Sequence, residues 1–476
     1  MTRMGTQKRH VITLNTLISG EVLMAINHFK RFTNVALLRQ FDFELLRRFL
    51  LPYRDYLCGT RNLKWADNFL TFPYEELLRI LVDPDNAMPQ DLLHGLNFIN
   101  EVSQNDDHES LYDAALRVGF DLETIKDLPS CDLAVLIWLQ KPVALERLHA
   151  GMQITKARKY ESFRGKVSGV VDVRDDTIRQ LENSLGDYYF KTRKGRGVRV
   201  FVFARNDGIW FIVRHGYLMK GESTITDEGQ TRRFVFRPEV YDVLILQPHD
   251  GELHIHTSTI GERRCYCALI GQYIYGDENA FDYDSDFPRF TLEPVRDQWR
   301  NILLCSDVES IESVALIEMR VSLPDSGNYV LTHKADCVFT AMEKCRQILL
   351  GEMEITMIRL RIKFFGEKTP RTVTLYTPNQ AVFERDSDSS AIIDYLQKRG
   401  LINTNPENKE QAHDISTSQF MFVNGETGHR WDDASRLAGR PWERTRSDSP
   451  AVASHYAAGH ELSASAPVSV LPNRLF

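Results

Sequence analysis

The hydrophobic periodicity of this chain changes near Gly165. Over residues 21–158, apolar residues recur at every third or fourth position, as Leu38, Phe41 and Leu45 do. This spacing places them on one face of a helix and indicates buried amphipathic helices. Beyond Gly165 the chain is rich in β-branched and aromatic residues separated by turn residues, which is typical of strands. The change predicts a multidomain α+β protein.

The length of 476 residues exceeds what one ordinary hydrophobic core supports, so we expect several folded units. The periodicity predicts a mainly α-helical domain at 21–160, a β-rich α+β domain at 165–300 and a further α+β domain at 305–402. We expect a flexible arm at 1–20. Asn, Ser, Ala and Pro dominate residues 403–476 without periodicity, which predicts a disordered tail.

Several elements can be placed from local signals. The clearest hairpin joins Val243–Leu246 to Leu253–His256, because Asp250-Gly251 between them supplies the left-handed backbone of a tight turn. In the following unit we expect a strand at 357–365 and a helix at 335–349.

Composition limits the classes of protein that fit. The formal net charge of -7 argues against a protein that coats nucleic acid over its whole surface. Seven cysteines without a CxxC pair argue against a disulfide framework or a zinc ribbon, and favour the cytoplasm. The sequence has no stretch of about 18 apolar residues and no convincing signal peptide, so we expect no membrane contact. It also lacks the glycine motifs that bind nucleotides, and we expect no cofactor.

The most basic segment of the chain leads into a strand-like stretch at Val198–Phe203. Arginine side chains form paired hydrogen bonds to phosphate oxygens, and Gly195 and Gly197 let the backbone come close. We therefore predict that this segment contacts nucleic acid or another polyanion. The alternative is a solvated loop that balances acidic residues nearby. The basic residues of the segment, with no acid among them, are Lys191, Arg193, Lys194, Arg196, Arg199 and Arg205.

A second basic element alternates strictly with apolar residues over 358–364. A strand has a period of two, so Arg359, Arg361 and Lys363 would share one face and the apolar side chains the other. A positive sheet face of this kind could contact a nucleic-acid backbone. The alternative is an ordinary strand with its polar side in water.

The triplet Arg214-His215-Gly216 resembles the opening signature of the histidine phosphatases, in which a strand ends in Arg-His-Gly. The resemblance implies that His215 takes a phosphoryl group as the nucleophile. It covers only these residues, and the family's second arginine, acid and second histidine have no counterparts that we can place. We therefore expect His215 to be structural.

Two further pairs alternate along expected strands. His254 and His256 could face one side and share a metal ion, but two ligands are fewer than zinc requires. We interpret these histidines as a surface pair. Cys265 and Cys267 have the same spacing, and we interpret them as small buried apolar residues.

An acidic segment partly matches a calcium-binding loop. Asp282, Asp284 and Asp286 occupy the first ligand positions of such a loop. Phe287 stands where the loop needs glycine for its sharp turn. We therefore expect an acidic surface loop and no metal site.

The favoured function is that of a nucleic-acid-associated protein without a recognisable catalytic motif, which binds phosphate backbones through local basic patches. The helical N-terminal domain would hold a protein partner. One alternative is a protein–protein scaffold or regulator without nucleic acid. Another is a phosphoesterase or nuclease. Asp242 and Glu252 resemble the carboxylate pair of restriction-type nucleases, although His254 stands where those enzymes need lysine.

Overall fold

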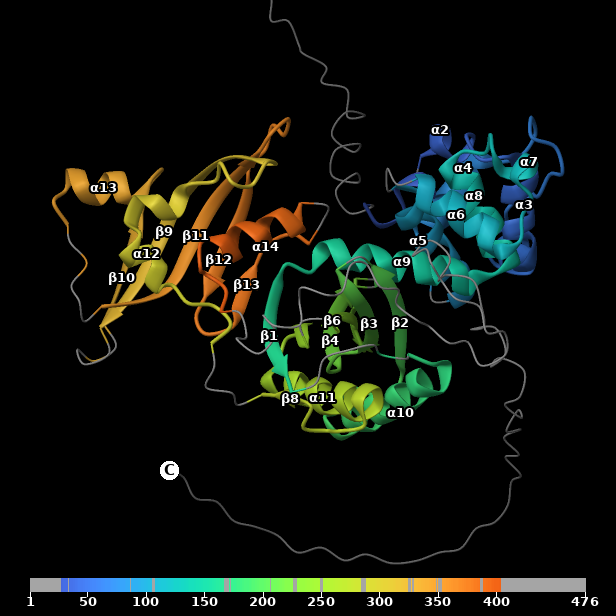
Figure 1. Cartoon of the computed structure of the whole chain (residues 1–476). Coiled ribbons are helices and arrows are strands. Elements are labelled where there is room, and N and C mark those ends of the chain that lie inside the picture. The colour runs from blue at the N-terminus through green and yellow to red at the C-terminus, as the bar shows by residue number, and fades with distance from the viewer. Residues whose placement is uncertain are drawn as a thin grey trace, which may run out of the picture. The chain divides into compact units, whose positions relative to one another are not determined.

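The structure is a computed structural model that describes residues 27–403. Gaps in this range fall at 33, 86, 105–107, 167–170, 172, 206, 226–228, 249–250, 284–287, 324–326, 328, 348, 350–352 and 386–387. The described residues form helices and a large antiparallel sheet, which confirms the α+β class (Figure 1). The expected arm at 1–20 and the expected tail at 403–476, apart from Asn403, lie outside the described residues. The division into domains stays a prediction.

The first part of the described chain is helical, as its periodicity indicated. Leu46 and Phe49 are buried in a core shared by these helices. The Asp42 carboxylate accepts a hydrogen bond from the amide of Leu45 at 3.0 Å and caps α3. No helix in the described ranges is long and apolar enough to cross a membrane. The helices are α2 (Val35–Leu38), α3 (Phe43–Leu50), α4 (Tyr74–Val82), α5 (Gln90–Gln104), α6 (His108–Val118), α7 (Leu122–Ile125), α8 (Ser130–Gln140) and α9 (Pro142–Lys156), with short 3₁₀ or π segments at Asn27–Phe32, Leu51–Tyr53 and Asp55–Thr60.

The strands begin after α9. Most of them carry β-branched and aromatic residues, as expected for a pleated and partly buried surface. They are β1 (Lys159–Gly165), β2 (Val198–Arg205), β3 (Gly208–Gly216), β4 (Lys220–Ile225), β5 (Thr231–Phe236), β6 (Glu239–Gln247), β7 (Glu252–His256), β8 (Phe281–Asp282), β9 (Ile311–Leu323), β10 (Tyr329–Lys334), β11 (Glu354–Phe364), β12 (Arg371–Tyr376) and β13 (Gln380–Val382).

One antiparallel sheet connects strands from both halves of the β-rich sequence. Within the described residues its order is β10-β9-β11-β12-β13-β1-β7-β6-β3-β2, with β8 paired to β1. Strand β1 makes the connection. Lys159 pairs with Val382 of β13, and Phe163 pairs with Leu253 of β7. The β4–β5 pair forms a separate two-stranded ribbon, inserted in the chain between β3 and β6.

Helices cover both faces of the β6–β3–β2 end of the sheet (Figure 1). On one face, Ile154 of α9 packs in a cluster with Trp210 and Ile245. The alternation of strand side chains turns His215 and Asp242 to the other face. Helices α10 (Asp175–Lys191) and α11 (Ile260–Ile270) lie there, and a π segment at Gly271–Tyr275 continues α11.

The β9–β13 strands have their own core. On β11, Ile358, Leu360 and Ile362 are buried while the residues between them are half-buried, so the expected alternation is confirmed. The helix expected at 335–349 is shorter than predicted: α13 ends at Lys344. The remaining helices are α12 (Glu293–Asp297), a 3₁₀ segment at Trp299–Leu303, and α14 (Ser389–Lys398).

Two local predictions have opposite outcomes. The β6–β7 hairpin is confirmed, with Leu246 opposite Leu253 and Gly251 at φ 62° in the left-handed region. The strand alternation assumed for Cys265 and Cys267 is wrong, because both lie in α11. That helix begins with a capping box in which the side chain of Thr259 accepts a hydrogen bond from the backbone of its third residue, Glu262, and the carboxylate of Glu262 accepts from the Thr259 amide.

Candidate functional site

The basic segment forms the tight loop between α10 and β2. Lys191 is the last residue of α10, and β2 starts at Val198. Arg193 at φ 65° and Gly195 at φ 89° both adopt the left-handed backbone conformation. This conformation reverses the chain within a few residues, so the basic side chains crowd into a short loop.

The loop does not present all of its charges to solvent. Lys194 is buried, and its ammonium forms an ion pair with the buried carboxylate of Glu262 on α11. Arg196 is exposed and pairs with Asp187 at 2.6 Å. The assumption that these charges lack acidic neighbours is therefore wrong for both residues. Lys191 and Arg193 are exposed, and Arg199 is half-buried on β2.

The β4–β5 ribbon is a basic element that sequence reasoning missed. Its described side chains are exposed, except Phe236, which is half-buried. The register places Phe234 and Phe236 on one face, where their rings stack with centroids 5.6 Å apart. The ribbon carries Lys220, Arg232 and Arg233. The signal was present as arginines flanking an apolar stretch, but nothing in the sequence located it beside the loop.

Arg237, directly after the ribbon, connects it to the basic loop. Its Nη1 donates to the carbonyl oxygen of Arg193 at 2.8 Å and to that of Tyr217 at 2.9 Å. Gly216 permits this approach. A Cβ atom added there would lie 2.3 Å from Cδ of Arg237 and 2.6 Å from the carbonyl oxygen of Lys194. Two basic segments that are distant in sequence therefore meet.

The second basic strand lies elsewhere and is largely neutralised. Arg359 pairs with Glu318 at 2.6 Å, and Lys363 pairs with Glu312 at 2.7 Å. Arg361 donates to the carbonyl oxygen of Asp336 at 3.3 Å. In the sheet order, β12, β13, β1, β7, β6 and β3 separate β11 from β2. The structure therefore does not combine the two expected patches into one site.

A buried polar cluster lies directly beneath the basic loop. His215 is the residue before the last of β3, Asp242 lies on β6 and Glu262 lies in the first turn of α11. Nε2 of His215 is 3.1 Å from Oδ2 of Asp242. The Thr257 hydroxyl lies 2.8 Å from Asp242 Oδ2 and 2.9 Å from Glu262 Oε2. Lys194 completes the cluster through its ion pair with Glu262.

The cluster is buried, and its surroundings shift the pKa values of Tyr266 and Glu262. Burial raises the pKa of the Tyr266 hydroxyl, which donates to Asp242 at 2.7 Å. Burial alone would also raise the pKa of the Glu262 carboxyl. Hydrogen bonds from Lys194, Thr259 and Thr257 outweigh that effect and hold this pKa below its usual value of 4.5. Glu262 is therefore ionised inside the protein.

His215 has the surroundings of a structural residue. Its ring stacks on that of Tyr189 with centroids 4.0 Å apart, and its side chain is 1% exposed. Such burial leaves no room for a phosphate ester at its nitrogens. The guanidinium of Arg214 lies near the carboxylates of Glu146 and Glu239. It does not form a site with His215.

The other candidate residues do not form sites as the sequence patterns suggested. His254 is fully buried and contacts Ser162 at 2.6 Å, so the interpretation of a surface histidine pair is wrong for it. Asp242 and Glu252 lie near opposite ends of the β6–β7 hairpin, because Glu252 pairs with Gln247. They cannot hold one metal ion as a nuclease pair does. Asp284 and Asp286 of the calcium-like segment lie outside the described residues.

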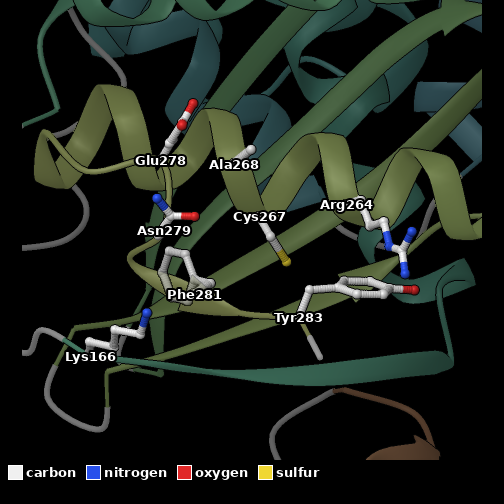
Figure 2. Close-up of a pocket in the computed structure, with 8 residues that line it drawn as sticks. All are labelled: Lys166, Arg264, Cys267, Ala268, Glu278, Asn279, Phe281 and Tyr283. Carbon is white, nitrogen blue, oxygen red and sulfur yellow. The ribbon is translucent and has the colours of Figure 1, made fainter. Parts of the chain in front are cut away.

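A small pocket of about 220 Å³ lies between α11 and β8 (Figure 2). Arg264 covers the ring of Tyr283 there, at 4.7 Å from its centroid. Cys267 also lines the pocket, but burial raises the pKa of its thiol and keeps it protonated. The pocket therefore offers no activated nucleophile from this cysteine.

Comparison with known proteins adds no functional assignment. No protein-family model matches the chain, and a search of curated proteins gives no significant match.

Proposed function

We propose that the chain binds nucleic acid through one basic surface, formed by the α10–β2 loop and the β4–β5 ribbon. The observation that carries this proposal is the position of Arg237, whose guanidinium joins the carbonyl oxygens of Arg193 and Tyr217. Arg237 thereby joins the loop to the residues that flank the ribbon. The exposed basic side chains of this basic surface, among which Arg196 is paired with Asp187, are Lys191, Arg193, Arg196, Lys220, Arg232, Arg233 and Arg237.

Phosphate is the chemical group that this surface fits. Arginine presents a planar fork of N–H donors that matches phosphate oxygens, and most of the basic side chains here are arginines. A compact group of cations on a chain with a net charge of -7 acts locally, because salt screens it within about 10 Å. Such a surface attracts a polyanion that comes close to it.

Exposed aromatic rings favour nucleic acid over other polyanions. Phe190 is 57% exposed, and the guanidinium of Arg196 already lies 4.3 Å from its ring centroid. Phe234 is 56% exposed on the ribbon. Bases stack on such rings, whereas a simple polyphosphate gains nothing from them.

Two parts of the sequence-based expectation are changed in this proposal. Lys194 is left out of the contact set because its ammonium is buried on Glu262, and Arg199 is left out because its side chain is half-buried on β2. Arg359, Arg361 and Lys363 are treated as a second, weaker surface, because Glu318 and Glu312 already neutralise two of them.

A second candidate function is that of a protein–protein scaffold. The ribbon also exposes apolar side chains, with Ile225 at 79% and Val235 at 55%. A neighbouring protein could bury these residues, as interfaces commonly do. The seven free cysteines fit a cytoplasmic setting for either function.

Binding of labelled single- and double-stranded DNA and RNA to the full-length chain tests the proposal. We expect binding at low salt that weakens linearly in log salt between about 50 and 200 mM. Sequence preference should be slight, since the basic surface offers arginines to phosphates and rings to any base. If none of the four nucleic acids binds at about 50 mM salt, the proposal fails and the scaffold function replaces it.

A further inference from the structure

The buried cluster beneath the loop brings three possible metal-ligand side chains together. His215, Asp242 and Glu262 each direct a nitrogen or oxygen atom to one place, and these atoms lie within 4.8 Å of one another. The three side chains are 1%, 3% and 2% exposed. They come from β3, β6 and α11, so the fold brings them together from distant parts of the sequence.

The histidine ring faces an acceptor on both sides. Nδ1 lies 2.8 Å from the carbonyl oxygen of Gly216, and Nε2 lies 3.1 Å from Oδ2 of Asp242. A carbonyl oxygen accepts hydrogen bonds and cannot donate, so Nδ1 must carry a proton. A neutral ring then turns the lone pair of Nε2 toward a carboxylate. Only a proton or a metal cation between the two atoms removes this conflict.

The Thr257 hydroxyl bridges the two carboxylates. It lies within hydrogen-bond distance of both Asp242 and Glu262, but it has a single proton to donate. Asp242 also accepts a hydrogen bond from Tyr266, and Glu262 accepts from Lys194 and from Thr259. These donors hold the two carboxylates in place, with an oxygen atom of each within 4.8 Å of a nitrogen atom of His215.

His254 provides a contrast within the same sheet. Its ring lies 2.6 Å from Oγ of Ser162 and 2.6 Å from Oε1 of Gln247. The serine hydroxyl can accept or donate, so a neutral ring satisfies both contacts. Burial also lowers the pKa of His254 and favours the neutral ring. The conflict at His215 is therefore not a general property of buried histidines in this protein.

We propose that His215, Asp242 and Glu262 bind a divalent transition-metal ion, Zn²⁺ or Mn²⁺. One imidazole nitrogen and two carboxylate oxygens form a ligand set that such ions accept. The Nδ1–H of His215 donates to the Gly216 carbonyl, which is the outer contact that typically orients a metal-binding histidine. Hydrogen bonds from Tyr266 and Thr257 orient Asp242 in the same way.

The ammonium of Lys194 competes with the proposed metal ion for the carboxylate of Glu262. The ammonium pairs with Glu262 and lies 5.0 Å from the ring centroid of Tyr217, at the edge of the cluster. The two carboxylates and the ammonium leave one negative charge, so a dication together with Lys194 leaves one positive charge. Metal binding and the Lys194–Glu262 pair therefore oppose each other, and removal of the ammonium strengthens metal binding.

The test uses the full-length chain, stripped of metal by chelation, without nucleic acid. Zn²⁺ and Mn²⁺ are titrated separately by calorimetry, and bound metal is counted after gel filtration. We expect one ion per chain and a rise in thermal stability on binding. Lys194→Met should tighten binding about tenfold or more, because a positive charge next to the metal is removed. His215→Gln should abolish it.

The test includes a control variant at a second buried histidine and an NMR measurement on the wild-type protein. His254→Gln removes another buried histidine from the same sheet and should leave metal binding unchanged. If His215→Gln fails to fold, the nitrogen resonances of His215 in the wild-type protein decide between the two outcomes. A metal-induced shift confined to Nε2 supports the site. A doubly protonated ring that ignores added metal, or a Lys194→Met variant with no gain in affinity, overturns it.

Discussion

The ammonium of Lys194 is buried against the carboxylate of Glu262, although Arg193 and Arg196 on either side of Lys194 are exposed. One residue of the basic loop thus anchors it to α11, and the others remain at the surface. The buried Lys194–Glu262 pair holds the loop against α11, and the exposed basic side chains of the loop take no part in this contact. A loop of like charges can keep a defined shape when one of them is neutralised inside the protein.

Lys194→Ala should lower the free energy of unfolding by about 3 kcal/mol or more, because it leaves the buried Glu262 carboxylate without its partner. Lys191→Ala, at an exposed position of the same loop, should change it by about 0.5 kcal/mol or less. Urea unfolding followed by circular dichroism measures both. Equal effects of the two substitutions would show that the buried pair contributes no stability.

The stability contributed by Glu262 should depend on pH. The pKa of this carboxyl is lowered in the folded protein, so its contribution is complete above its usual value of 4.5. The contribution is then lost as the pH falls through the lower value of the folded state. The difference in unfolding free energy between wild type and Glu262→Gln should therefore shrink between about pH 5 and pH 3. Exposed Glu278→Gln is the control and should follow wild type throughout.

The basic surface should determine the salt dependence of nucleic-acid binding. Replacing Lys191, Arg193 and Arg196 by Ala should lower the slope of log affinity against log salt by up to about three units. The control replaces Lys64, Lys126 and Lys368, which are exposed elsewhere, and removes the same charge. Anisotropy titrations at several salt concentrations give the slopes. Equal slopes for the two variants would place the contact outside the loop.

Gly216→Ala should disrupt the junction between loop and ribbon. The new Cβ would overlap Arg237 and the Lys194 carbonyl, and we expect a loss of about 1–3 kcal/mol in stability together with weaker nucleic-acid binding. Gly197→Ala is the matched control in the same region, because a Cβ there meets no atom within 4 Å. Thermal unfolding and binding are measured on both variants. A stable Gly216→Ala variant with normal binding would contradict the role given to this junction.

Phe234→Ala should weaken binding of single-stranded nucleic acid by about 1–3 kcal/mol while leaving the fold intact, since the ring is exposed and available for stacking. Val235→Ala is the control, because the register turns Val235 to the opposite face of the ribbon. Anisotropy with a single-stranded probe compares the two. A larger loss from Val235→Ala would indicate that the other face makes the contact.

The elements that could be predicted from the sequence are those whose side-chain pattern matches their surroundings. On β11, Arg359 and Arg361 alternate with buried Leu360, and this period of two identified the strand. The β6–β7 hairpin was predictable because Gly251 marks its turn. In α11, by contrast, Cys265 and Cys267 imitate strand spacing, and only the capping box at Thr259 signals a helix.

The candidate sites were less predictable, because they depend on contacts between distant segments. A run containing Lys194 indicates positive charge, but nothing in the sequence locates Glu262, 68 positions away, against it. The same applies to Arg237 and Arg193, which lie 44 positions apart. The exposure of the β4–β5 ribbon could not be predicted for another reason. The adjacent apolar residues Phe234 and Val235 suggest a buried strand, whereas both are exposed.

The sheet around strand β1 can be completed only late in synthesis of the chain. The Asn379 side chain donates to the Ser162 carbonyl of β1 across 217 positions of chain, and Val382 pairs with Lys159. A ribosome adds about 5–20 residues per second, so β1 waits for its second neighbour for tens of seconds at the slower rate. Throughout that time one hydrogen-bonding edge of β1 is open to other chains. During this interval the nascent chain depends most on chaperones to keep the open edge of β1 from pairing with other chains.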